Sequence, residues 1–269
     1  MKAAINGVVC DVENAAELPR TRRGVFETML WIDAAPRFWA EHWDRFVAGI
    51  RWASLPDVGR ADDALALARE IGAANGVTTG VLRLAQWRSN EGQTEWRIEV
   101  TPPRAHQRQP EFTLTTGAIL PPADAARPFK HLDRGRWLDA LRTARARGFD
   151  ECVLVDESRN AIEGGVSNIF FVSGGTLHTP ALHHGPLPGI MRAHIIAAAQ
   201  RYGISVREGS YRLTEVFAAD EIWLTNSLIG IRPVARFDDR AMPAQRATLT
   251  AFRERWRQEF DWDPVIVMS

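Results

Sequence analysis

Residues 148–171 read GFDECVLVDESRNAIEGGVSNIFF and give the clearest indication of the fold. It contains the short apolar runs ECVLVD, AIEGG and NIFF, separated by polar residues, which predict successive strands. Glu163 lies near the end of the middle run, and the two glycines after it would let a flat ring come close. A glutamate beside paired glycines is also common in an ordinary turn, so these residues alone leave both interpretations open.

The periodicity of the rest of the chain predicts an α+β protein in two parts. Asn6-Gly7 predicts a hairpin turn between two short strands near the start of the chain. Residues 101–110 contain three prolines and no periodicity, so we expect a linker there between domains at 1–105 and 111–269. Helical periodicity is expected over the segments 36–56, 62–76, 134–148, 190–203, 213–221 and 243–260.

Composition argues against several classes of partner. The formal net charge is zero, which does not favour binding to nucleic acid or to an acidic membrane surface. No apolar run reaches the length of a membrane span. Cys10 and Cys152 lack metal-ligand spacing, and the adjacent His183 and His184 have no further ligands nearby in the sequence, so we expect no metal. These features predict a cytoplasmic protein that acts on a small molecule.

Lys130 is unusual because almost all of the basic residues in this sequence are arginine. Of 33 basic residues only Lys2 and Lys130 are lysine, and Lys2 lies at the start of the chain. Arginine replaces lysine where only charge and reach matter, but its guanidinium cannot lose the proton and attack a carbonyl. Lys130 is therefore a candidate for an imine with a substrate or with pyridoxal phosphate, although a lysine retained by chance on a loop is the alternative.

Two further stretches have the chemistry of an anion site. Pro188-Gly189 leads directly into a helix, so the first backbone N–H groups, those of Ile190 and Met191, lie at its positive end. Thr225, Asn226 and Ser227 follow a strongly apolar run, where their polar groups suit a phosphate. Many helices begin in this way and such polar residues also cap loops, so each signal is weak alone.

In combination and in this order, these motifs resemble a known family. The segments FKHLDR, GFDECVLVDESRNAIEGGVSNIFF, LPGIMR and DEIWLTNSLIGIRPV are similar to those of the class IV, fold-type IV pyridoxal-phosphate enzymes. The resemblance continues more thinly into GVFETM and EHWDRF. It implies a small N-terminal α/β domain, a larger C-terminal pseudo-barrel domain, pyridoxal 5'-phosphate bound between them, and a homodimer whose partner chain borders the site.

The resemblance also implies roles for individual residues. Lys130 matches the Schiff-base lysine that also moves protons on the substrate carbons, and Glu163 matches the acid beside the pyridine nitrogen. Arg45, in EHWDRF, matches an arginine that binds the phosphate. The remaining cofactor contacts implied are the helix-start amides of Ile190 and Met191, the hydroxyl of Ser227, and the adjacent Asn226.

The family contains branched-chain aminotransferases, D-amino acid aminotransferases and 4-amino-4-deoxychorismate lyases. The segment TNSLIGIRPV and the short chain favour the lyase, which expels pyruvate and yields 4-aminobenzoate for folate synthesis. A transaminase acting on D- or branched-chain amino acids is the alternative, and a non-catalytic protein that has kept the fold is a remote one. Arg22-Arg23-Gly24 stands where many relatives have Gly-Asp-Gly, and Arg88-Ser89 where many have Arg-Gly, so the substrate residues depart from the family pattern.

Overall fold

The computed structural model describes residues 1–13, 18–19, 24–89, 91–103, 109–120, 129–260 and 262–264. Its internal contacts divide the chain into two compact units. The first is built from Met1–Gln107 and Pro128–Arg134, and the second from Arg108–Arg127 and Gly135–Val267. This division places the segment that carries Lys130 with the N-terminal part of the chain. Part of the expected linker lies outside the described residues, and the domain limits 1–105 and 111–269 stay a prediction.

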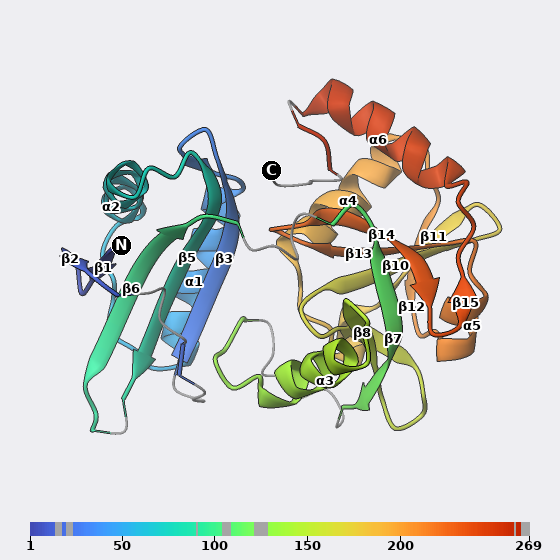
Figure 1. Ribbon diagram of the computed structural model, residues 1–269, viewed down its shortest axis with the longest axis horizontal. Coiled ribbons are helices and arrows are strands. Elements are labelled where there is room, and N and C mark those ends of the chain that lie inside the picture. The colour runs from blue at the N-terminus through green and yellow to red at the C-terminus, as the bar shows by residue number, and fades with distance from the viewer. Residues whose placement is uncertain are drawn as a thin grey trace. The chain divides into compact units, whose positions relative to one another are not determined.

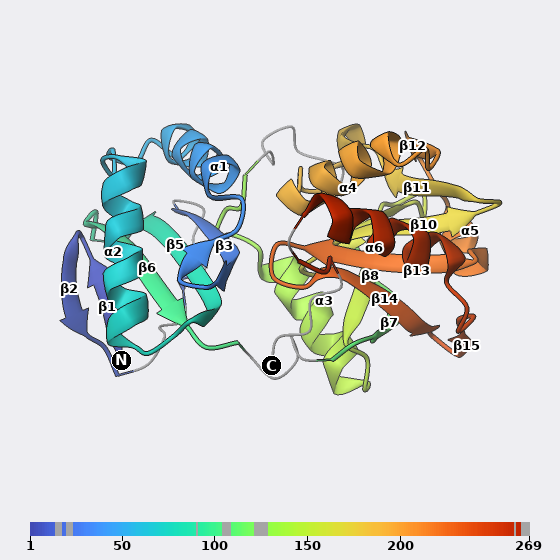
Figure 2. The same cartoon turned by 90° about the horizontal axis from the view of Figure 1, so that it is seen from above.

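The first unit is an antiparallel sheet with two helices on one face (Figures 1 and 2). The Asn6-Gly7 hairpin is confirmed, because both residues have positive φ, 51° and 83°, as a tight two-residue turn requires. The strand order is β2-β1-β6-β5-β3-β4. The elements are β1 (Lys2–Ile5), β2 (Val8–Asp11), β3 (Gly24–Ile32), β4 (Ala35–Pro36), α1 (Trp39–Trp52), α2 (Ala61–Ala74), β5 (Thr79–Arg88) and β6 (Thr94–Thr101).

The alternation of side chains along β3 separates the two faces of this sheet. Val25 and Met29 pack with Phe46 of α1 in the main core of the unit. Phe26 belongs to a different cluster, with Trp87 and neighbouring residues. Odd-numbered residues of β3 therefore face the helices, and even-numbered residues face the opposite side.

The second unit is built on a curled sheet (Figure 2). Its strand order is β12-β11-β10-β13-β14-β7-β8-β9, with β15 paired to β14. A tight turn joins β9 to β10, in which the N–H of Gly164 donates to the carbonyl of Ser167 at 2.6 Å. The strands are β7 (Phe112–Ile119), β8 (Glu151–Val155), β9 (Ala161–Gly164), β10 (Asn168–Ser173), β11 (Thr176–Pro180), β12 (Val206–Gly209), β13 (Glu221–Asn226), β14 (Gly230–Phe237) and β15 (Arg240–Ala241).

Helices cover this curled sheet and complete its core. They are α3 (Gly135–Ala146), α4 (Ile190–Arg201), α5 (Leu213–Ala218) and α6 (Ala247–Glu259), with a 3₁₀ turn at Leu182–His184. Helix α6 begins at Ala247, later than the predicted residue 243, because its first N–H groups are held by Glu221, which accepts from Thr248 and Leu249. The α+β fold class predicted from the sequence is confirmed.

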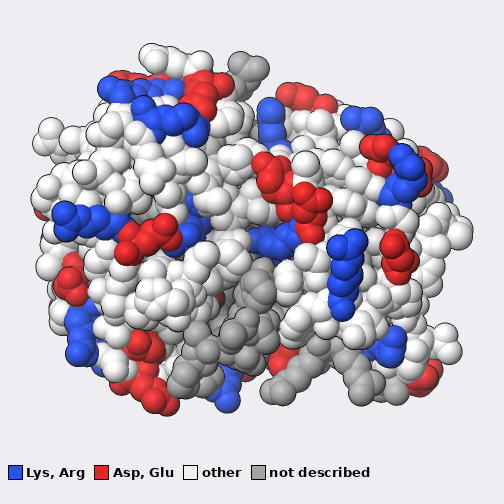
Figure 3. Space-filling model, turned by 180° about the vertical axis from the view of Figure 1, so that it is seen from behind, with Lys and Arg blue, Asp and Glu red and all other residues white. Residues whose placement is uncertain are grey.

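The surface shows no preference for one sign of charge on the face drawn in Figure 3. Acidic and basic side chains are interspersed there, as expected for a chain of zero formal net charge. Within the described part of the chain, no helix is long and apolar enough to cross a membrane.

Candidate functional site

The segment that carries Lys130 runs along the edge of β3. The N–H of Phe26 donates to the carbonyl of Lys130 at 2.9 Å, and the N–H of Leu132 donates to the carbonyl of Gly24 at 2.9 Å. Glycine is needed at position 24, because a Cβ there would lie 2.6 Å from Leu132 Cδ1 and 2.7 Å from Trp87 Cβ. A pairing between residues about a hundred positions apart thus holds the Lys130 backbone against the first residues of β3.

The Lys130 side chain lies on the face of β3 away from the helices. Its Nζ donates to Thr28 Oγ1 at 3.0 Å and lies 5.4 Å from the centre of the Phe26 ring. Both partners are even-numbered residues of the same strand, two positions apart. A hydroxyl and an aromatic face therefore both contact the amino group of Lys130 on this side of the strand.

Arg45 lies on the other face of β3, where it forms a buried cluster with Glu27 and His42. Arg45 Nε and Nη2 donate to the two carboxylate oxygens of Glu27 at 2.7 and 2.9 Å. His42 Nδ1 lies 2.7 Å from Glu27 Oε2. Glu27 and His42 are 1% and 0% exposed, and Arg45 retains 10% side-chain exposure. Helix α1 thus presents two residues, three positions apart, to one carboxylate of β3.

The charges of this cluster follow from its burial and pairing. Burial disfavours ionisation of Glu27, but the Arg45 charge and the His42 contact outweigh it and hold the pKa of Glu27 well below its usual range. Burial lowers the pKa of His42 despite the neighbouring carboxylate. Glu27 is therefore ionised and His42 neutral at physiological pH, so Nδ1 carries the hydrogen that Glu27 accepts.

The sequence singled out Arg45 and Lys130 but missed Glu27, Thr28 and His42. The signal was present, because Glu27 and Thr28 lie within GVFETM and His42 lies within EHWDRF. A strand places neighbouring residues on opposite faces, so Glu27 and Thr28 could have been assigned to two different partners. Which partners these were depended on packing between β3, α1 and residues 129–132.

In the second unit, Glu163 lies at the end of β9 with both carboxylate oxygens engaged. Trp137 Nε1, on α3, donates to Oε1 at 2.8 Å, and the backbone N–H of Leu187 donates to Oε2 at 3.0 Å. Glu163 is only 7% exposed. The Leu187 contact joins the carboxylate to the loop that immediately precedes α4.

The glycines after Glu163 have a structural reason that the sequence did not reveal. A Cβ on Gly164 would lie 2.2 Å from Ser167 Oγ, and one on Gly165 would lie 3.0 Å from Glu151 Oε1. Glu151 is 1% exposed, and its oxygens accept from the N–H groups of Gly165 and Val166 at 3.0 and 3.2 Å. They also accept from Ser167 Oγ at 3.1 Å. Burial raises the pKa of Glu151. Glycine is therefore required at positions 164 and 165 by contacts with the chain's own atoms, in addition to any space that a flat cofactor ring would need there.

The start of α4 is tied to the same region. Asn168 Nδ2 donates to the carbonyl of Leu187 at 2.8 Å, and a Cβ on Gly189 would lie only 2.0 Å from Asn168 Oδ1. Gly189 is the N-cap and has no side chain to bond the first N–H groups of the helix. Ile190 and Met191 are both buried at this point. The structure thus brings Glu163 and the predicted helix-start amides together through Leu187.

The polar residues Thr225 and Asn226, which follow the apolar part of β13, bond to different parts of the chain. Thr225 Oγ1 donates to the carbonyl of Gly230 at 2.6 Å. Asn226 Oδ1 accepts from the N–H groups of Leu228 and Ile229 at 2.8 and 3.0 Å, and its Nδ2 donates to the carbonyl of Val166 at 3.0 Å. Asn226 therefore builds the turn and joins it to the loop after Glu163. The half-buried Ser227 is presented by that turn, and cofactor contacts from either residue stay a prediction.

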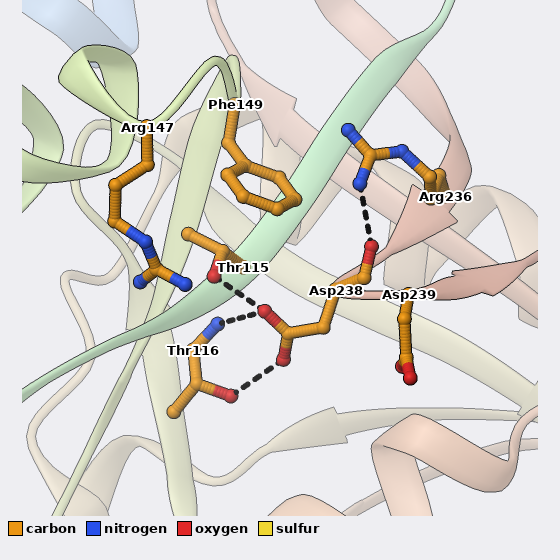
Figure 4. Close-up of a pocket in the computed structure, with 7 residues that line it drawn as sticks. All are labelled: Thr115, Thr116, Arg147, Phe149, Arg236, Asp238 and Asp239. Carbon is orange, nitrogen blue, oxygen red and sulfur yellow. Dashed lines mark hydrogen bonds between the residues drawn. The ribbon is translucent and has the colours of Figure 1, made fainter.

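A separate hollow of about 580 Å³ lies elsewhere in the second unit (Figure 4). The Phe149 ring lies there between Arg147 and Arg236, whose guanidinium carbons are 5.5 and 4.6 Å from its centre. Two aspartates balance the two arginines, so the hollow favours neither sign of ligand. None of the predicted site residues lines it. Its lining residues are Thr115, Thr116, Arg147, Phe149, Arg236, Asp238 and Asp239.

Solved structures share this architecture over nearly the whole chain. A branched-chain aminotransferase from Thermoproteus uzoniensis, solved with norvaline, matches with a TM-score of 0.82 and 23% identity, covering 96% of this chain and 94% of that one. An aminotransferase from Brucella abortus bound to the cofactor PLP matches with a TM-score of 0.79 and 23% identity, covering 96% and 98%. At these identities the likeness shows the fold, which is the predicted fold-type IV arrangement.

Sequence comparison identifies the family. Aminodeoxychorismate lyase of Bacillus subtilis is 33% identical over 118 residues, which cover 43% of this chain and 40% of that protein. The alignment thus spans less than half of this curated relative. The model of the amino-transferase class IV family matches residues 24–237, which is most of the chain. The resemblance predicted from the motifs is confirmed, and the chain belongs to the class IV aminotransferase family, whose members use pyridoxal phosphate.

Proposed function

We propose that this protein is a pyridoxal-phosphate enzyme that converts 4-amino-4-deoxychorismate into 4-aminobenzoate and pyruvate. The observation that carries the cofactor part is the link from Glu163 through Leu187 to the uncapped start of α4. The lyase part is supported by the turn at Asn226–Ile229, because the segment TNSLIGIRPV is similar to the version common among lyases. The likeness to the Bacillus subtilis lyase supports the same choice.

The residues present fit a phosphorylated pyridine. The first N–H groups of α4 receive no hydrogen bond from the side chain of the N-cap residue, which is the arrangement that a phosphate uses at a helix start. Ser227 would add a hydroxyl, and Arg45 a guanidinium, to the phosphate. Glu163 would accept from the protonated ring nitrogen. Lys130 would hold the cofactor covalently through Nζ.

Bound pyridoxal phosphate supplies a ring that withdraws the charge left when a substrate carbon loses a proton. We assign the proton transfers to Lys130 Nζ, which in its unprotonated form would accept the proton from the substrate carbon. Thr28 Oγ1, at 3.0 Å, holds Nζ on the face of β3 that lies away from the helices. In the lyase reaction the same Nζ then supplies a proton to the departing pyruvate.

A class IV aminotransferase is the second candidate, favoured by the solved branched-chain aminotransferase that shares this fold. In that reaction Lys130 Nζ would move the proton from one carbon to another instead of giving it to pyruvate, and the product would be a keto acid. A protein that has kept the fold without turnover is a remote third candidate. It is disfavoured because such a protein has no need of a lysine at position 130.

Two assays separate these candidates. Purified protein is incubated with 4-amino-4-deoxychorismate while 4-aminobenzoate is measured, and separately with D- or L-amino acids and 2-oxoglutarate or pyruvate. We expect 4-aminobenzoate release that is lost in Lys130→Ala. Amino-group transfer from simple amino acids without 4-aminobenzoate would replace the lyase with the aminotransferase. A colourless protein that does not respond to added pyridoxal phosphate would exclude both enzymes.

We also propose the homodimer that the family resemblance implies. Light scattering coupled to size-exclusion chromatography is expected to give twice the chain mass of 30.1 kDa.

A further inference from the structure

We propose that Glu27 is a positioning residue, which orients Arg45 for the cofactor phosphate and is itself oriented by His42. The inference rests on the proposed function, because it concerns the phosphate group that Arg45 would bind. Glu27 touches neither substrate nor cofactor in this account. It acts only through the guanidinium to which it is bonded.

The geometry of the cluster supports this role. Glu27 belongs to β3, whose residues pair with β5 along the whole strand, so its backbone is rigidly placed. Its two oxygens meet Nε and Nη2 of Arg45 at 2.7 and 2.9 Å, which is the two-point contact that fixes the plane of a guanidinium. The Nη1 edge of Arg45 therefore points away from Glu27. His42 Nδ1 lies 2.7 Å from Oε2, the same oxygen that Arg45 Nη2 contacts, and adds a second hydrogen bond that fixes the carboxylate.

Such an arrangement lowers the entropic cost of binding an anion. An arginine side chain has many rotamers, and ordering them when a ligand arrives weakens the affinity. Glu27 orders Arg45 in advance. Helix α1 supplies both Arg45 and His42, so the contact also fixes α1 to β3 at this point.

If Glu27 influenced the cofactor phosphate only through its charge, its effect on phosphate affinity would be opposite to that of positioning. Glu27 is ionised and His42 neutral, so the cluster as a whole has no net charge although Arg45 is its cationic member. A carboxylate beside the arginine repels a phosphate and weakens its binding. Removing the carboxylate therefore strengthens phosphate binding if Glu27 acts by charge, and weakens it if Glu27 acts by positioning. The two effects have opposite signs, which makes the proposal testable by affinity alone.

The test is the dissociation constant of pyridoxal phosphate, measured by absorbance titration of the protein stripped of cofactor. We expect Glu27→Gln to weaken pyridoxal phosphate about tenfold or more, the range for one oriented charged hydrogen bond. Pyridoxal, which lacks the phosphate, is expected to bind both proteins alike. The matched control is Glu221→Gln, which changes another buried carboxylate, in the second unit, and is expected to leave both affinities unchanged.

Two further variants keep the outcome decisive. Glu27→Asp retains the charge but withdraws the carboxylate by one methylene. A positioning role therefore predicts weaker binding of pyridoxal phosphate, whereas an effect of charge alone predicts unchanged binding. In the pair Glu27→Gln and Arg45→Gln, the double variant is expected to bind no more weakly than Arg45→Gln alone. Circular dichroism checks that each variant is folded, and Glu27→Asp serves if Glu27→Gln is not.

Tighter or unchanged binding of pyridoxal phosphate to both Glu27 variants would overturn the proposal, as would additive losses in the double variant. This failure differs from failure of the proposed function. If the unaltered protein does not bind pyridoxal phosphate, or binds pyridoxal equally well, the cofactor assignment itself is wrong. If it binds with a phosphate-dependent affinity that Glu27 does not influence, only the positioning role is lost.

Discussion

In the first unit, side chains of neighbouring β3 residues contact the two candidate cations, whereas in the second unit backbone N–H groups donate to the buried carboxylates Glu163 and Glu151. Thr28 contacts Lys130 and Glu27 contacts Arg45. In contrast, Glu163 accepts from the N–H of Leu187, and Glu151 accepts from those of Gly165 and Val166. A side-chain contact can be removed without moving the chain, but a backbone contact depends on the path of the chain itself. Substitutions in the first unit should therefore act mainly on chemistry, and those in the second mainly on stability.

The largest effect is expected at Lys130, where the first unit supplies the reacting group. Lys130→Ala should lower kcat/KM by about 1,000-fold or more, because no other group replaces an amine that both binds covalently and moves protons. The measurement is steady-state turnover of the substrate identified above. Lys2→Ala is the matched control, since the Lys2 side chain is partly exposed and pairs with the exposed Asp11 at 2.7 Å. Residual activity of a tenth or more in Lys130→Ala would contradict the assignment.

The next largest effect tests the second unit through Glu151. Glu151→Ala should lower the free energy of unfolding by about 3 kcal/mol, because the N–H groups of Gly165 and Val166 and the Ser167 hydroxyl lose a buried acceptor. Urea denaturation followed by circular dichroism measures the change. The exposed Glu157→Ala serves as control and should change stability by less than about 0.5 kcal/mol. Equal stability of the two variants would contradict the expectation that substitutions in the second unit act mainly on stability.

Trp137 tests whether a side chain in the second unit acts on chemistry rather than on stability. Trp137→Phe keeps the aromatic ring but removes the hydrogen bond to Glu163 Oε1. The expected loss is about tenfold or less in kcat/KM, the worth of one hydrogen bond to a charged group, with stability within about 1 kcal/mol of the original. Trp96→Phe, on the first sheet, is the control. A larger loss of stability than of activity would make Trp137 a packing residue.

The smallest expected effect is a pH dependence in the first unit. The folded pKa of His42 is depressed by burial, so the unfolded chain takes up a proton near pH 6.5 while the folded one does not. Stability should therefore fall as pH drops below about 6.5, by about 1 kcal/mol over the first unit of pH. His42→Asn, which keeps a donor near Nδ1 but does not titrate, should lose less stability than the original protein when the pH falls. Urea denaturation of both proteins at pH 7.5 and 5.5 measures the two changes in the free energy of unfolding. Equal changes in the two proteins would contradict the prediction.

Local periodicity was sufficient for most of the fold. Trp43, Phe46 and Ile50 recur at helical spacing and are the buried face of α1, and Asn6-Gly7 forms the expected turn. These features depend on residues close together in the chain, where backbone geometry alone sets the pattern. The start of α6 was placed too early, because its position depends on Glu221, more than twenty residues away.

The candidate site was predictable in its chemistry but not in its supports. Lys130 was predicted because arginine cannot form an imine, and Glu163 because it precedes two glycines in a family motif. Glu27, His42 and Glu151 also lie within the quoted motifs, but a sequence does not show which ionisable side chains become buried or what they contact. The interpretation of the glycines was incomplete for the same reason, because Glu151 and Ser167 approach them only after the sheet has curled.

Periodicity and motif order were enough to predict the fold class and the family, and the scarcity of lysine was enough to single out Lys130 as a candidate, because these are local properties of the chain. Which groups hold the candidate residues in place depended on tertiary packing. It set Lys130 and Arg45 on opposite faces of β3, and it joined Glu163 to the start of α4 through Leu187. Contacts of this kind link residues far apart in sequence, and they exist only once strands have paired and helices have packed.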